Sequence, residues 1–142
     1  MEDMLKGIDN KATLEAIENL LREYRTCLLT VPDVYLPKVT ANYTLEMPNY
    51  SNIKQSSTEN AAIKNVDEGI YREKFIKRVV NGLKKLNFLE RQLITLAYLT
   101  IEPHYNYEIY RKLNISEAKF YRTRTRALYK LALATGEEVY FE

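Results

Sequence analysis

Two helical patterns near the C-terminal end of the chain are separated by only two residues, Asn114 and Ile115. The first pattern covers residues 107–113, and the second begins at Ser116, a residue type that often caps helices. A link this short allows only a tight turn, and asparagine tolerates the left-handed backbone that such a turn requires. The sequence therefore predicts a helix-turn-helix layout within about residues 105–133, in which Ile115 fills the turn.

The second helix is expected to run from Ser116 to Gly136, which terminates it. Its apolar residues at helical spacing predict a buried stripe, formed by Phe120, Ala127, Leu128 and Leu131. The outward face of its N-terminal half then carries Glu117, Ala118, Tyr121, Arg122 and Thr125. In a helix-turn-helix this half enters the major groove of double-stranded DNA, so we expect these five residues to contact bases. The flanking residues expected at phosphates are Lys119, Arg124, Arg126 and Lys130.

Arg122 is the preferred base reader, because a guanidinium can form a bidentate pair with guanine that lysine cannot copy. Glu117 has two interpretations: it accepts a hydrogen bond from a cytosine amino group, or it favours the positive end of the helix dipole. Tyr121 either contacts DNA or packs on a neighbouring helix. The alternative for the whole segment is an ordinary two-helix corner with a charged exterior.

Charge is unevenly distributed along the chain. The formal net charge is +2, yet residues 103–135 hold seven basic and two acidic side chains. The rest of the chain is therefore mildly acidic. A basic segment on an acidic chain favours a phosphate-rich partner, because each neutralised phosphate releases counterions. A solvated helix face is the simpler explanation of the charge taken alone.

The rest of the chain predicts a mostly α-helical protein. Residues 1–57 are expected to form an N-terminal helix, over about 13–29, and an extended or irregular arm with a possible short hairpin. Residues 58–142 are expected to form the helical DNA-binding domain. It opens with a long helix over 58–86, capped by Thr58 and broken near Gly69. A capping box at 87–90 then starts another helix, which ends before Pro103.

Enzymatic activity is not expected. The single histidine, His104, follows Pro103 in a predicted surface loop, and no paired nucleophile accompanies it. The single cysteine, Cys27, has apolar neighbours and is expected to pack in the core. With four glycines, the chain has no nucleotide-binding fingerprint, so no cofactor or metal is expected. The absence of a secretion signal or a long apolar run favours a cytoplasmic protein.

Residues 86–131 resemble region four of bacterial sigma factors. The shared features are a leucine-led helix with Glu-Arg-Gln at 90–92, Glu-Ile at 108–109, a turn ending at Ser116, and Arg-x-Arg-Ala-Leu-x-Lys-Leu at 124–131. Two positions depart from that pattern. Tyr110 replaces the usual small alanine and Asn114 the usual turn glycine, so the packing of the two helices must differ in detail.

Nearly the whole chain resembles the ArpU-type regulators of phages and prophages of Gram-positive bacteria. The features are Tyr-Arg at 24–25, Tyr-Leu-Pro-Lys-Val-Thr-Ala-Asn-Tyr at 35–43, the Glu-Arg-Gln helix, and Ser-Glu-x-x-Phe-Tyr-Arg at 116–122. The segment at 35–43 is the distinctive one, since helix-turn-helix motifs occur in many unrelated regulators. The resemblance implies a positive transcriptional regulator of late phage genes, including packaging and lysis functions, that binds a promoter or operator.

Two other classes of protein fit the same motif. A small terminase subunit would share the DNA-binding unit and use the helix over 58–86 to form a ring. A sigma-like module would bind host RNA polymerase and barely contact DNA. The apolar face of the N-terminal helix is consistent either with packing on its own core or with a homodimer.

Overall fold

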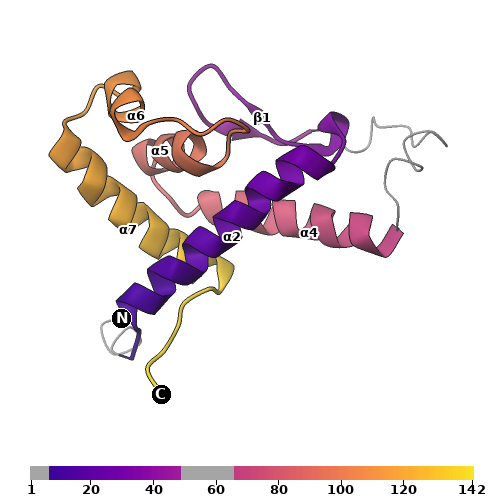
Figure 1. The fold of residues 1–142 in the computed structure, drawn as a ribbon, viewed down its shortest axis with the longest axis horizontal. Coiled ribbons are helices and arrows are strands. Elements are labelled where there is room, and N and C mark those ends of the chain that lie inside the picture. Colours follow the sequence, from indigo (N-terminus) through magenta and orange to yellow (C-terminus); the bar gives the residue numbers. More distant parts are fainter. Residues whose placement is uncertain (1–6, 49–65) are drawn as a thin grey trace.

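The computed structural model describes residues 7–48 and 66–142, and this part of the chain is mostly helical, as predicted. Its helices are α2 (Asn10–Thr30), α4 (Val66–Leu83), α5 (Phe88–Tyr98), α6 (Asn106–Lys112) and α7 (Glu117–Thr135). A 3-10 helix η1 (Asp33–Tyr35) and the strands β1 (Lys38–Val39) and β2 (Leu45–Glu46) lie between α2 and α4. In Figure 1, α2 crosses α7, and α6 lies at the end of the molecule away from the C-terminus.

The first helix is longer than the sequence pattern predicts. It begins at Asn10 because the Asp9 side chain accepts a hydrogen bond from the Ala12 amide, at 3.1 Å. The start of α2 is also tied to the C-terminal end of the chain: the Asp9 amide donates to the Val139 carbonyl at 2.7 Å. As predicted, Cys27 is buried in the core, and burial raises the pKa of its thiol.

The arm after α2 forms a short hairpin, which was one of the two options that the sequence offered for this segment. β1 pairs with β2 in antiparallel register, and the turn between them places Tyr43 at φ +62°. The tip of the hairpin lies on α5 and α6: Gln92 Nε2 donates to the Asn42 carbonyl at 2.9 Å, and Lys112 Nζ lies 5.7 Å from the Tyr43 ring centroid. The tyrosine-rich segment is therefore packed against the C-terminal helices.

The next two helices differ in how well the sequence predicts their ends. The predicted cap of α4 at Thr58 lies outside the described residues, as does the predicted domain boundary at residue 57. The predicted break near Gly69 is wrong, since α4 continues through it, and the helix ends at Leu83, before the predicted end at 86. The capping box of α5 is confirmed: Asn87 accepts from the Glu90 amide and Glu90 from the Asn87 amide, both at 2.8 Å.

The turn between α6 and α7 follows the predicted chemistry. Asn114 adopts a left-handed conformation with φ +55°, and the Ile115 amide donates to the Tyr110 carbonyl at 3.0 Å. Ser116 caps α7 by accepting from the Lys119 amide at 3.1 Å. Gly136 ends the helix with φ +79°. The sequence thus determines both ends of α7 through one side-chain cap and one glycine.

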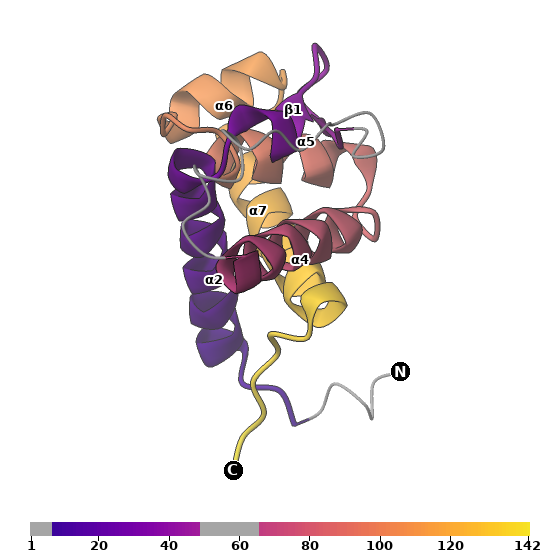
Figure 2. The ribbon, with the colours of Figure 1, turned by 90° about the vertical axis from the view of Figure 1, so that its right-hand side faces the viewer.

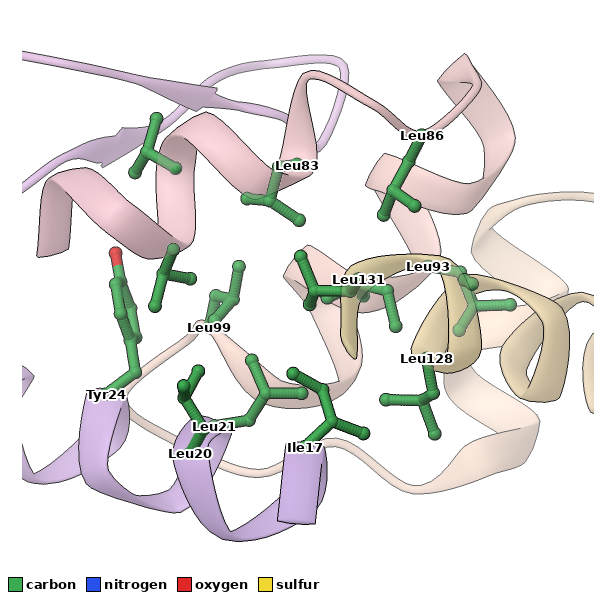
Figure 3. Close-up of a cluster of buried hydrophobic side chains, with 14 of the residues drawn as sticks. Ile17, Leu20, Leu21, Tyr24, Leu83, Leu86, Leu93, Leu99, Leu128 and Leu131 are labelled. Carbon is green, nitrogen blue, oxygen red and sulfur yellow. The ribbon is translucent and has the colours of Figure 1, made fainter. Parts of the chain in front are cut away.

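A single hydrophobic cluster joins α2, α4, α5 and α7. Figure 3 shows leucines of the last three helices meeting Ile17, Leu20, Leu21 and Tyr24 of α2. Ile17 and Tyr24 are fully buried. The N-terminal helix therefore packs on the same core as the C-terminal helices, which fixes its position relative to α7.

Gly82 allows α4 to approach α7 closely where α4 lies across it (Figure 2). A Cβ at this buried position would lie 2.8 Å from Thr135 Cγ2 and 2.9 Å from Leu131 Cδ1. We expect Gly82→Val to lower the free energy of unfolding by about 1–3 kcal/mol, because the added atoms must displace buried neighbours. Urea denaturation measures this loss, with Gly7→Val outside the helix contact as control. Unchanged stability of Gly82→Val would contradict the close packing.

Candidate nucleic-acid interface

The outward face of α7 carries all five residues predicted to read bases. Glu117, Ala118, Tyr121, Arg122 and Thr125 are exposed, whereas the predicted inward residues Phe120, Ala127, Leu128 and Leu131 are buried. The buried stripe also includes Thr123, which the apolar pattern could not indicate. The helix therefore presents a polar surface over its N-terminal half while its opposite side anchors it in the core.

Arg122 is exposed in the middle of this face. It also lines the side of the face that is turned toward the start of α2. An exposed arginine at this place can reach a partner without disturbing the packing of α7.

Tyr121 is exposed and also bonded to the neighbouring helix α6, while its contact with DNA stays a prediction. The side chain is 41% exposed, and its ring packs edge-on against Phe120 with centroids 5.2 Å apart. Asn106 Nδ2 of α6 donates to the Tyr121 hydroxyl at 3.4 Å. The tyrosine thus links the outward face of α7 to the beginning of α6 and keeps part of its surface free for a partner.

Arg124 is less free than the sequence suggests. Its guanidinium carbon lies 5.3 Å from the Tyr121 ring centroid and 5.8 Å from that of Phe120. It also lies near Tyr98 of α5: burial raises the pKa of the Tyr98 hydroxyl, and the positive charge of Arg124 opposes that rise. Arg124 is half-buried, so part of its charge interacts with the two rings of α7.

Arg126 and Lys130 bind a buried carboxylate. Arg126 Nε donates to Glu90 Oε2 at 2.9 Å, and Lys130 Nζ donates to Glu90 Oε1 at 3.0 Å. Burial by itself raises the pKa of Glu90. The hydrogen bonds from the Asn87 amide and from these two cations lower it by more, so the net shift is downward. The capping glutamate of α5 therefore holds two cations of α7 in place.

The four predicted phosphate contacts consequently differ in their surroundings. Within the described residues, the Lys119 side chain makes no ion pair or hydrogen bond, and it is exposed. Arg126 and Lys130 remain 52% and 42% exposed, so each bound cation still faces solvent. The contact with phosphate stays a prediction for all four residues.

Sequence reasoning identified Glu90 as a helix cap and missed its ionic partners, which lie 36 and 40 residues away. It also missed a groove beside the outward face of α7. The groove lies between α2 and α7 and is lined by Asn10, Leu14, Tyr121, Arg122, Thr125, Arg126 and Tyr129. No pattern within α7 could indicate it, because one wall comes from the other end of the chain.

His104 lies in the loop before α6, as predicted, with Nδ1 3.4 Å from the Thr100 hydroxyl. Over residues 7–48 and 66–142, no group of three or more histidine, cysteine or acidic side chains could hold a metal ion. In the same part of the chain, no helix has the length and apolar character needed to cross a membrane.

The chain is similar over most of its length to proteins that come from phages or are named as phage-related. It is 28% identical over 137 residues to a Streptococcus phage O1205 protein named as a candidate autolysin regulatory protein, ArpU, covering 96% of this chain and 93% of that one. It is 27% identical over 135 residues to protein Gp66 of Listeria phage A118, covering 95% and 92% of the two chains. An uncharacterized phage-related protein of Listeria innocua is 26% identical over 128 residues, or 90% and 89% of the two chains. No protein-family model and no solved structure matches the chain.

Proposed function

We propose that this protein is a sequence-selective, double-stranded DNA-binding regulator of transcription and not an enzyme. The observation that carries the proposal is the outward face of α7. An exposed arginine lies near the middle of this face, the face is exposed over the N-terminal half of α7, and a tight turn joins α7 to α6. In a helix-turn-helix, the second helix uses this half to enter the major groove.

The proposed roles follow from the positions of the side chains. Arg122 reads a guanine through a bidentate pair, and Glu117, Ala118, Tyr121 and Thr125 contact neighbouring base edges. Lys119 contacts a phosphate, and Arg124, Arg126 and Lys130 add positive charge around the face. Because Glu90 fixes two of these cations, the protein meets DNA with part of its charge already oriented.

The regulated genes are proposed from the relatives. A regulatory protein of a phage is similar to this chain over almost its whole length. Together with the sigma-region-four-like sequence at 86–131, this supports an activator of late phage or prophage genes, such as those for packaging or lysis. The similarity to a regulatory protein also favours a regulator over a small terminase subunit. A terminase subunit would instead form a ring of many subunits.

Selection from a pool of randomised duplexes tests the proposal. We expect the protein to enrich one sequence and to bind it at least ~10³-fold more tightly than a scrambled duplex at physiological salt. Fluorescence anisotropy at several salt concentrations gives both affinities. If no sequence is enriched and binding is equally weak on all duplexes, the proposed function is wrong, and RNA polymerase becomes the partner to test by direct binding.

Lys119→Ala tests the phosphate role of the one flanking cation that has no partner within the described residues. We expect weaker binding to selected and scrambled duplexes alike, with the salt slope of log K reduced by about 1, because one phosphate contact is lost. Lys84→Ala, an exposed lysine after α4, is the matched control and should leave the slope unchanged. A change in sequence preference at constant slope would contradict a phosphate role for Lys119.

A further inference from the structure

The groove between α2 and α7 extends the outward face of α7 beyond the two helices of the motif. Tyr121, Arg122 and Thr125 belong both to the predicted base-reading set and to the wall of this groove. The opposite wall is the first turn and a half of α2, with Asn10 and Leu14. A partner that contacts Arg122 therefore lies directly beside α2.

The chemistry of the groove favours an anion with several acceptor oxygens. The residues that line it carry two guanidiniums, three hydroxyls, one amide and no carboxylate, while most of the surface inside the groove is formed by their carbon atoms and by Leu14. Glu90 bonds Arg126 through Nε, so the terminal amino groups of that guanidinium stay outside this bond. A sugar-phosphate strand offers acceptor oxygens at regular intervals to such a row of donors.

The wall formed by α2 is held firmly in place. The Asp9 amide donates to the Val139 carbonyl at 2.7 Å, and the Val139 amide donates to the Thr13 hydroxyl at 2.9 Å. Ile17, one turn further on, is fully buried in the core. Asn10 is thus fixed next to α7 before any partner arrives, which reduces the entropy lost on binding.

We propose that this groove holds one sugar-phosphate strand of the duplex bound by α7, and that Asn10 and Tyr129 are DNA contacts. The proposal rests on the proposed function and adds a second contact element, α2, to the helix-turn-helix. The strand that borders the major groove lies next to the base edges read from within it, so reader and groove contacts can form together.

Asn10→Asp tests this contact with little risk to the fold. Asn10 is the first residue of α2, where a negative charge interacts favourably with the helix dipole. The same charge would repel a phosphate in the groove. We expect the affinity for the selected duplex to fall about 3–10-fold at low salt, with the difference shrinking as salt rises.

Two further variants complete the test. Asn19→Asp is the matched control, because nine residues turn its side chain to the opposite face of α2, where it already bonds Arg22 at 2.7 Å. Its affinity should stay within about twofold of wild type, as expected for a screened surface charge. Tyr129→Phe removes one hydroxyl from the groove and should weaken binding about 2–10-fold.

The outcomes separate this proposal from the proposed function. Weaker binding of Asn10→Asp and Tyr129→Phe, with Asn19→Asp unchanged and all melting temperatures maintained, supports the strand in the groove. Selective binding by wild type that neither groove variant alters overturns the groove contact and leaves the function standing. Absence of selective binding by wild type overturns both.

Discussion

Glu90→Ala is expected to destabilise the protein by about 2–4 kcal/mol, because three donors lose their shared acceptor. These donors are the Asn87 amide, Arg126 Nε and Lys130 Nζ, all within 3.0 Å of the carboxylate. The two cations are partly exposed and can be rehydrated, which keeps the loss below that of breaking a fully buried ion pair. Urea denaturation at neutral pH gives the value.

Glu108→Ala is the matched control. Glu108 occupies the same third position in α6 and accepts from the Tyr105 amide at 3.2 Å, and among residues 7–48 and 66–142 it has no cation of another helix as a partner. Its loss should stay near about 1 kcal/mol, as for a helix cap alone. Equal losses for the two variants would show that the link from Glu90 to α7 contributes nothing to stability.

The same carboxylate makes stability dependent on pH. The folded pKa of Glu90 is lowered, so its contribution is fully present above the unfolded pKa of about 4.3 and is lost as pH falls through the folded pKa. Glu90→Gln should therefore show a shallower loss of stability below about pH 4.3 than wild type. If the free energy of unfolding of Glu90→Gln falls as steeply below this pH as that of wild type, Glu90 is not the group responsible.

Arg122→Ala is expected to remove most of the sequence selectivity. Loss of a bidentate pair with guanine corresponds to about 1–3 kcal/mol of discrimination, so affinity for the selected duplex should fall about 5–150-fold. Binding to a scrambled duplex should fall much less. Because Arg122 is exposed, the stability of the protein should not change.

Arg122→Lys separates charge from geometry. Lysine keeps the positive charge but lacks the planar fork, so the variant should recover the salt dependence of wild type without its selectivity. Anisotropy with selected and scrambled duplexes measures both properties. A lysine variant as selective as wild type would show that Arg122 acts only through its charge.

Local signals in the sequence predicted the local features of the fold. The Asn87 capping box, the left-handed Asn114, the Ser116 cap and the Gly136 stop all depend on residues close together in the chain. The same holds for the buried stripe of α7, which follows from helical spacing. These features define where the candidate interface lies and which way it faces.

Contacts between distant segments could not be predicted in this way. The bonds from Glu90 to Arg126 and Lys130 connect separate helices, and Asn10 reaches the groove because the two ends of the described chain pair beside it. The charge pattern alone treated all cations of α7 alike. The structure distinguishes Lys119, with no partner within the described residues, from cations that also hold the fold together.

The account depends most on the outward face of α7 being the surface that contacts DNA. Titration of the ¹⁵N-labelled protein with its selected duplex, followed by amide chemical shifts, tests this directly. We predict saturable shifts concentrated at residues 117–125 and at the start of α2, with small changes in α4. Saturable shifts centred on α4 or the hairpin, with α7 unaffected, would contradict the account.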